Sequence, residues 1–424
     1  MVHCRCQCSA RSVRLVKQKI ISLFSGAGGL DFGFEAAGFE TSVALDLDRQ
    51  ACDLLRANRR WPVICDDLAR VPTKGILETA GLRQGDAAVL IGGPPCQPFS
   101  KSGYWVRGDA ARLRDPRAET LKGYLRVLED ALPEAFLLEN VPGLAYSGKS
   151  DGLEYLRYEI AEINKRQGTE YKMSVACLNA ADFGVPQLRQ RVFVIGHRSG
   201  AEFKFPEITH EDPSTGTSRL QPYCTAWDAL GDLPELINDP ELRLTGKWAD
   251  LLPSIPEGRN YLWHTDRGEG LPLFGWRRRY WNFLLKLARG LPAWTLQAQP
   301  GPATGPFHWA NRHLTARELM RLQTFPDDVE LDCSRRDAQR LVGNAVPSAL
   351  AETLAREIQR QFFGAYVATK ITLLPSRRTR SDVEYPTRAV PERYLKLIGT
   401  HAPHPGTGKG NRAVAWTREA IAAE

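Results

Sequence analysis

Short apolar runs recur through the first 200 residues, and each ends in glycine, proline or acidic residues. Their length is that of buried strands, and they occupy residues 19–24, 41–45, 63–65, 87–91 and 135–138. Helix-like stretches lie between them, for example at 31–37 and 119–132. Strands that alternate with helices predict a parallel sheet whose strand carboxyl ends share one edge. We therefore expect an α/β fold with a doubly wound, mostly parallel sheet and a ligand site along that edge.

The same alternation continues with a helical stretch at 153–165 and strands at 172–178 and 192–195. It then stops, because residues 200–311 are rich in proline, glycine and tryptophan and contain no repeat. We interpret this stretch as a second, smaller and irregular domain.

Regular elements return with Thr315-Ala316-Arg317-Glu318, a capping box that predicts the start of a helix. Pro347 is expected at the first position of a last helix that reaches about Phe363. The sequence thus predicts one domain in two parts, 19–199 and 312–364, and a second domain at 200–311. It also predicts a flexible tail at 1–18 and a basic extension of unassigned role at 365–424.

Cys96 is the first nucleophilic side chain after the strand at 87–91, beyond two glycines and two prolines. A thiol on a stiff loop at the carboxyl end of a strand is suited to covalent catalysis. The alternative is a small buried hydrophobe, the usual role of a free cysteine. The polar loop at 101–117 that follows is long enough to serve as a mobile lid.

A glycine-rich turn, 25–30, joins the first strand to the first helix, where backbone amides can approach a ligand. The dinucleotide pattern G-x-G-x-x-G would require glycine where this chain has Asp31, a residue that could hold a cationic ligand. Asp46 ends the second strand, about 20 residues later, where an acid typically binds ribose hydroxyls. Asp66 and Asp67 end the third strand and could contact an adenine ring or cap a helix.

Glu139 follows the apolar strand at 135–138, so we expect partial burial and a raised pKa. It could then act as a proton donor or hydrogen-bond acceptor near Cys96, whereas capping the next helix is the alternative. Arg189 and Arg191 share one face of an extended segment and could bind an anion bidentately. Surface solvation is the alternative for Arg189.

A basic run bracketed by aromatic residues, Trp276-Arg277-Arg278-Arg279-Tyr280-Trp281, lies within 200–311. This pairing is suited to phosphate contacts and base stacking. A solvated arginine face over a small aromatic core explains it equally well.

Composition narrows the class of protein. The chain has 424 residues, a net charge of +7 and nine cysteines, an odd and scattered set that argues against a disulfide framework. Ten of the lysines and arginines but only five acidic residues lie between Lys370 and Glu424, which favours a polyanionic partner. No apolar run approaches the length needed to span a bilayer and the chain start lacks the apolar core of a secretory signal, so we expect a cytoplasmic protein without membrane contact. Cys4, Cys6 and Cys8 alternate without the usual metal-site spacing, and no metal is expected.

Six motifs, taken together, resemble those of a known protein family. They are Phe24-Ser25-Gly26-Ala27-Gly28-Gly29-Leu30, Pro94-Pro95-Cys96-Gln97, Glu139-Asn140-Val141, Gln187-x-Arg189-x-Arg191, Arg312 through Pro326, and Gly343-Asn344-Ala345-Val346-Pro347. In this order, over roughly Ile20 to Phe363, they resemble the S-adenosylmethionine-dependent DNA (cytosine-5)-methyltransferases, in particular those of bacterial restriction–modification systems. The resemblance implies a class I, Rossmann-like methyltransferase fold. It also implies that 200–311 is a target-recognition domain within a catalytic domain formed by the remaining core.

The resemblance implies a role for each motif. Cys96 would add to C6 of a flipped-out cytosine, Glu139 would contact N3 and the amine, and Arg191 with Arg189 would hold the base and orient Glu139. The methyl donor would be bound by Phe24, Ser25, Gly26, Ala27, Gly28, Gly29, Leu30, Asp46, Leu47, Asp67, Leu68, Pro94, Asn344 and Val346. DNA would be contacted by Gln97, Ser100, Gln187, Arg277, Arg278, Arg279 and Thr295. The chain departs from the family at Asp46, where glutamate is usual.

The expected partner is double-stranded DNA, and a cognate restriction endonuclease is expected to act on the same site. We expect the enzyme itself to be monomeric and associated with the nucleoid through DNA. One alternative is methylation of a tRNA cytosine, although the size of 200–311 favours DNA. Another is a catalytically inactive DNA-binding regulator, against which Cys96, Glu139 and Arg191 argue. Asp31 and the Pro-Pro-Cys loop argue against an NAD-linked oxidoreductase.

Overall fold

The computed structural model describes residues 17–95, 119–144, 151–215, 219–365, 368, 370–379 and 385–403. Seven strands form one sheet in the order β3-β2-β1-β4-β5-β8-β6. Their bounds are β1 (Lys19–Leu23), β2 (Glu40–Asp46), β3 (Val63–Cys65), β4 (Val89–Gly92), β5 (Ala135–Asn140), β6 (Lys172–Asn179) and β8 (Gln190–His197). Only β8 runs antiparallel to its neighbours, β5 and β6. The predicted mostly parallel α/β sheet is confirmed.

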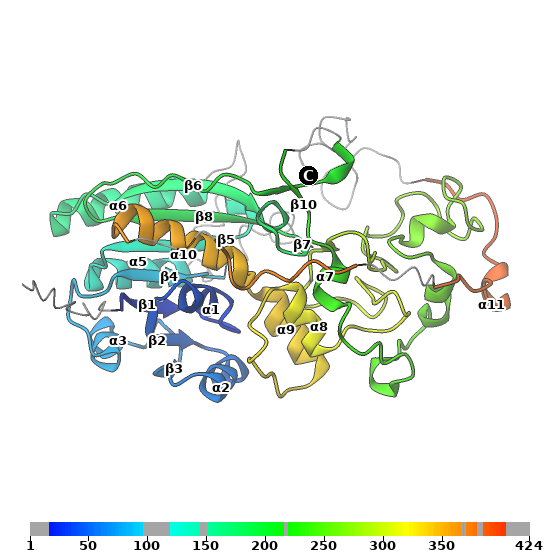
Figure 1. The fold of residues 1–424 in the computed structure, drawn as a ribbon, viewed down its shortest axis with the longest axis horizontal. Helices are drawn as coiled ribbons and strands as arrows, with labels where there is room; N and C mark the ends of the chain where they lie inside the picture. Colours follow the sequence, from blue (N-terminus) through cyan, green and yellow to red (C-terminus); the bar gives the residue numbers. More distant parts are fainter. Residues whose placement is uncertain are drawn as a thin grey trace, which may run out of the picture.

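Helices cover both faces of the sheet (Figure 1). Their bounds are α1 (Gly29–Ala36), α2 (Arg49–Asn58), α3 (Thr73–Ala80), α5 (Glu119–Ala131), α6 (Asp151–Gln167) and α10 (Ser348–Phe362). One face packs on α3, α5 and α6, and the other on α1 and α10, because the strands present apolar side chains on both sides.

The last long helix returns to the beginning of the chain. A Cβ added at Gly33 would lie 2.4 Å from that of Ala351, so α1 and α10 touch backbone to backbone. The end of the chain's core therefore closes against the helix that follows the glycine turn. Pro347 stands at the N-cap and Ser348 is the first helical residue, so the predicted start was one residue too early.

The capping box predicted at Thr315 and Glu318 is formed at α8 (Ala316–Leu322). A further helix, α9 (Arg335–Asn344), was not predicted, because its sequence was interpreted only as a motif ending in Pro347. Ser334 caps it by accepting the Asp337 amide N–H.

Within 200–311 the structure describes one α-helix, α7 (Ala226–Leu230), besides 3₁₀ turns and two-residue strands. The apolar residues of this stretch enter two different cores. Leu230, Leu296 and Trp309 pack with α2, α8 and α9. Leu251, Phe274 and others form a separate core in what we call the distal lobe, residues 244–285 and 388–403 (Figure 1, right).

Candidate active site

Glu139 lies at the carboxyl end of β5, beside the loop that leaves β4. The two strands are parallel, with Gly92 opposite Leu138, so Gly93, the first residue after β4, lies beside Glu139 near the end of β5. A Cβ added at Gly93 would lie only 2.8 Å from Glu139 Oε2. Glycine at this position therefore lets the carboxylate approach the backbone of the Pro-Pro-Cys loop.

Arg191 holds this carboxylate. Strand β8 runs antiparallel to β5, with Val192 opposite Asn140, and brings the Arg191 Nε to 2.9 Å from Glu139 Oε1. Both side chains are largely buried, at 14% and 12% exposure, so the pair is shielded from bulk solvent. Such a pair fixes the carboxylate in one orientation.

Burial raises the pKa of Glu139, and the guanidinium groups of Arg191 and Arg189 oppose this shift. The expected burial and raised pKa are therefore both present. A carboxyl group whose pKa is raised holds its proton more firmly than a free glutamate and is better suited to share it with a basic ring nitrogen.

Asn140 ties the two loops together, a contact that sequence reasoning missed. Its Nδ2 donates to the Pro94 carbonyl oxygen at 3.1 Å, and its Oδ1 accepts the Val141 amide. The position of Asn140 immediately after Glu139 was the available signal. Cys96, Gln97, Ser100 and the loop at 101–117 lie outside the described residues.

Arg189 is fully buried, so surface solvation is excluded for it. Its guanidinium donates to the carbonyl oxygens of Leu296, at 3.2 Å, and Gly343, at 2.8 Å. Gln187 is also fully buried and spans the same junction, accepting the Leu296 amide and donating to the Leu322 carbonyl. These polar groups join the sheet, the 200–311 segment and the returning helices behind the Glu139–Arg191 pair.

The glycine turn at the start of α1 is closed by Asp46. Gly26 and Gly28 have positive φ, at 53° and 82°, which suits glycine. Asp46 accepts the Gly26 amide on Oδ2 at 2.7 Å and the Asp48 amide on Oδ1 at 2.8 Å. Burial raises the pKa of Asp46. Beside it, the Leu47 side chain is 69% exposed.

The remaining residues predicted for the donor pocket fall into two groups. The first group lies at the glycine turn and the start of α1 and consists of Phe24, Ser25, Ala27, Gly29 and Leu30. A Cβ added at Gly29 would lie 2.1 Å from the Val346 carbonyl oxygen, so the segment that contains Asn344 and Val346 lies against this turn. Around β3, Asp67 caps a turn by accepting the Ala69 amide, and Leu68 is buried in the core. The side chains around β3 are thus engaged within the protein.

Asp31, which replaces the third glycine of the dinucleotide pattern, is fully buried beneath the turn. Neither carboxylate oxygen has a hydrogen-bond partner among the residues that the structure describes. Burial raises its pKa to about 7.

The basic run lies on the surface of the distal lobe, where Arg277, Arg278 and Arg279 are exposed. Its last residue connects it to the active-site strands, because the Trp281 ring contacts that of Trp294 with centroids 5.5 Å apart. Trp294 belongs to β11 (Ala293–Trp294), which pairs with β7 (Gln187–Leu188). Thr295 follows and donates to the Leu188 carbonyl oxygen at 2.6 Å.

Across the described ranges, His, Cys, Asp and Glu side chains nowhere gather in a group of three or more that could hold a metal ion. Cys4, Cys6 and Cys8 lie outside those ranges. None of the described helices combines the length and the apolar character needed to cross a lipid bilayer.

Comparison with known proteins agrees with this arrangement. The family model described as C-5 cytosine-specific DNA methylase matches residues 18–360. The chain belongs to this family. It is an enzyme, a DNA (cytosine-5)-methyltransferase.

Curated relatives of this methyltransferase include the Type II methyltransferase M.SacI of Streptomyces achromogenes. The two are 39% identical over 392 residues, which cover 86% of this chain and 98% of the relative. The Type II methyltransferase M.NgoFVII of Neisseria gonorrhoeae is 34% identical, over 82% of this chain and 88% of its own.

Solved structures share the fold. A prophage-encoded E. coli protein described as a DNA modification methyltransferase superposes with a TM-score of 0.56 at 22% identity, covering 82% of this chain and all of the other. The Entamoeba histolytica methyltransferase EhMeth gives a TM-score of 0.51 at 18% identity, over 81% of this chain and 98% of its own.

Proposed function

We propose that the enzyme transfers a methyl group from S-adenosylmethionine to C5 of a flipped-out cytosine in a specific duplex DNA sequence, through a covalent bond between Cys96 and C6. The observation that carries the proposal is the Glu139–Arg191 pair beside Gly93. Gly93, which this carboxylate faces, lies three residues before Cys96 in the chain.

The chemistry of cytosine explains why these residues are needed. Its C6 is a weak electrophile, and addition of a thiolate there places electron density on N3. Glu139, with its raised pKa, can donate a proton or hydrogen bond to N3. Arg191 keeps the carboxyl group oriented toward the base. Loss of the C5 proton and departure of Cys96 then restore the aromatic ring.

S-adenosylmethionine, when bound, supplies an electrophilic methyl group attached to a sulfonium. The residues around the glycine turn fit this ligand. Two hydrogen bonds fill only part of the acceptor capacity of the Asp46 carboxylate, which leaves lone pairs for ribose hydroxyls. Leu47 offers an exposed apolar surface to an adenine ring. A Cβ added at Gly26 would meet no atom within 4 Å, so space exists beside the turn.

Duplex DNA hides the reacting atoms of cytosine, so the base must leave the helix at a cost of a few kcal/mol. We assign DNA recognition to 200–311, with the exposed arginines at 277–279 as phosphate contacts. Residues 19–199 and 312–364 form the catalytic domain in this proposal. The printed names of the relatives support a restriction–modification setting, in which an endonuclease acts on the same site.

The test measures transfer of tritiated methyl groups from S-adenosylmethionine to unmethylated duplex DNA by the wild type and by Cys96→Ala, with tRNA in parallel. Incorporation into DNA by the wild type alone is expected, and bisulfite sequencing of the product identifies the methylated cytosine. Incorporation into tRNA alone would replace DNA by RNA as the substrate. Donor binding without transfer to either nucleic acid would refute the proposed reaction.

A further inference from the structure

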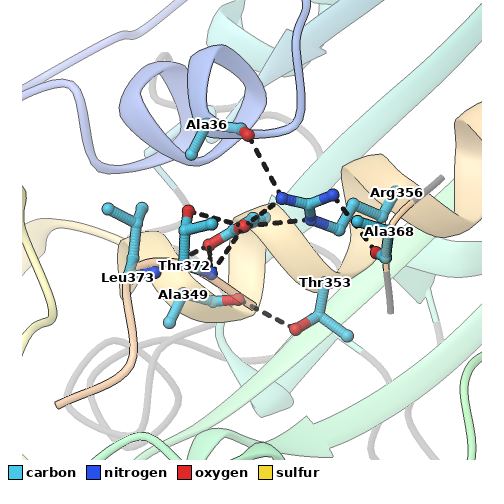
Figure 2. Close-up of polar contacts among 8 residues, drawn as sticks. Ala36, Ala349, Thr353, Arg356, Ala368, Thr372 and Leu373 are labelled. Atoms are coloured by element: carbon cyan, nitrogen blue, oxygen red, sulfur yellow. Dashed lines mark hydrogen bonds and ion pairs between the residues drawn. The ribbon is translucent and has the colours of Figure 1, made fainter. Parts of the chain in front are cut away.

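The described residues beyond α10, 370–379 and 385–403, lie against the rest of the protein. Their first attachment is Glu352, a fully buried carboxylate on α10. Figure 2 shows Arg356 of the same helix close to Thr372 and Leu373 of the following segment. Glu352 accepts the amide N–H of Thr372, at 2.8 Å, and of Leu373, at 3.0 Å, as well as the Thr372 hydroxyl at 2.8 Å. Arg356 completes the site with an ion pair at 2.7 Å. A buried carboxylate needs such partners, and residues 372–373 supply three of them.

A second attachment lies at α7, between the sheet and the distal lobe. Asp228 is buried and accepts the Arg378 amide N–H at 2.8 Å and the Arg377 guanidinium at 3.1 Å. In the opposite direction, the Trp227 indole donates to the Thr379 carbonyl oxygen at 2.9 Å. Residues 377–379 are therefore fixed by both side chains and backbone.

A third attachment completes the core of the distal lobe. Tyr394, in α11 (Glu392–Leu395), is only 3% exposed and stacks on Trp248 with ring centroids 5.6 Å apart. Its hydroxyl donates to the Lys247 carbonyl oxygen, 2.6 Å away, and lies 2.5 Å from the Asp250 carboxylate. Arg393 pairs with the same carboxylate. Without Tyr394, the lobe would lack one of the walls of its core.

The last described residues meet the base of the basic run. The Arg278 Nε donates to the Ala402 carbonyl oxygen at 2.8 Å. A Cβ added at Gly275 would lie 2.7 Å from the same oxygen, so the two backbones are in contact. His401 bonds in turn to the carbonyl oxygens of Pro272, at 3.2 Å, and Leu397, at 2.8 Å.

We propose that residues 370–379 and 385–403 form a brace between the catalytic sheet and the distal lobe, and that residues 399–403 position Arg278 and its neighbours for DNA binding. This inference rests on the proposed function, because it assigns the exposed arginines to phosphate. Arg278 is the link, since its Nε is held by Ala402 while the guanidinium remains exposed. The brace is attached on the side of α10 and on the distal lobe, and none of its described hydrogen bonds reaches Asp46 or Glu139.

Three forms of the enzyme test this inference: the full chain, a chain ending at 403 and a chain ending at 398. The chain ending at 398 keeps the Tyr394 anchor and loses the contact with Arg278. The chain ending at 403 is the matched control, because it removes only 404–424, with the charges of Lys409, Arg412 and Arg418. Duplex-DNA dissociation constants, KM for DNA, kcat and the dissociation constant for S-adenosylmethionine are measured for each.

Relative to the 403 form, the 398 form is expected to have roughly tenfold higher DNA Kd and KM, and a salt slope of DNA binding lower by about 1. Its kcat and donor affinity should be unchanged. Equal DNA affinity in the two forms would overturn the inference. A parallel loss of donor affinity would also overturn it, because it would indicate a general defect in folding.

Tyr394→Phe and Tyr394→Ala provide a second test. Phenylalanine keeps the stacking on Trp248 and should alter DNA Kd less than about threefold, whereas alanine should reproduce the loss in the 398 form. An alanine variant with wild-type DNA affinity contradicts the brace. DNA binding that responds to these changes, in an enzyme that methylates no DNA, would refute the reaction and leave the brace intact.

Discussion

Gly93→Ala tests whether the position of the Glu139 carboxylate controls the reaction. The added Cβ would lie 2.8 Å from Oε2, whereas ordinary contacts begin at 3.4 Å, so the carboxylate or the loop must move by about 0.6 Å. The carboxylate cannot swing away freely, because Arg191 holds its other oxygen at 2.9 Å. Misplacement by 1 Å can cost about a hundredfold in rate, so 0.6 Å corresponds to a loss of roughly tenfold in kcat.

The assay is single-turnover methyl transfer to duplex DNA, with the donor Kd and the melting temperature measured in parallel. Gly75→Ala is the matched control, because this glycine lies within α3 and an added Cβ would meet no atom within 4 Å. It should leave kcat unchanged and stabilise the protein by about 0.5–1 kcal/mol.

A double-mutant cycle isolates the contact. In a Glu139→Ala background the added methyl group has no carboxylate to displace, so Gly93→Ala should have no further effect on the residual rate. A folded Gly93→Ala enzyme with kcat within about twofold of the wild type would refute the reasoning. So would an equal loss in the presence and absence of Glu139.

Three further outcomes are expected. Arg191→Lys keeps the charge but loses the planar guanidinium contact with Glu139, so kcat should fall about 10- to 100-fold with donor Kd unchanged by titration calorimetry. Asp46→Ala removes two hydrogen bonds that close the glycine turn, and equilibrium binding should show donor Kd raised at least about tenfold; an unchanged Kd would exclude Asp46 from the pocket. Asp31 has a folded pKa of about 7, above its unfolded value near 3.8, so its ionisation destabilises the fold increasingly as pH rises through this window. Between pH 4.5 and pH 8 the wild type should therefore lose about 2–4 kcal/mol more of its free energy of unfolding than Asp31→Asn loses. An equal change in the free energy of unfolding of the two proteins, measured with denaturant at both pH values, would contradict this.

Much of the fold could be predicted from the sequence, because strand and turn signals are local. The apolar run 135–138 predicted a strand, and the structure extends it to Asn140. Thr315 and Glu318 predicted a cap that forms as expected. The predicted raised pKa of Glu139 followed from the apolar strand before it, since burial there was foreseeable from local pattern alone.

Distant contacts could not be predicted in this way. Arg189 and Arg191 are two residues apart and were predicted to share one face of an extended segment. In the structure, however, Arg189 donates to the carbonyl oxygens of Leu296 and Gly343, while Arg191 pairs with Glu139. The strand that follows Arg191 favoured it over Arg189 as a site residue, but nothing local predicted that Arg189 would be fully buried against backbone carbonyls. Their separate partners arise because β8 pairs with β5, about 50 residues earlier, while β7 pairs with β11, more than 100 residues later.

The sequence by itself determined the order of strands and helices, the glycine turn and the acidic residues at the strand ends, since these depend on neighbours within a few positions. Tertiary structure alone decided that Gly93 faces Glu139 and that the Asp31 carboxylate is fully buried. It also decided that Glu352 is satisfied by the backbone of a tail 20 residues further along the chain. The reason is physical: a buried polar group must find its partners in space, and the chain's folding, not its local pattern, determines which groups are near.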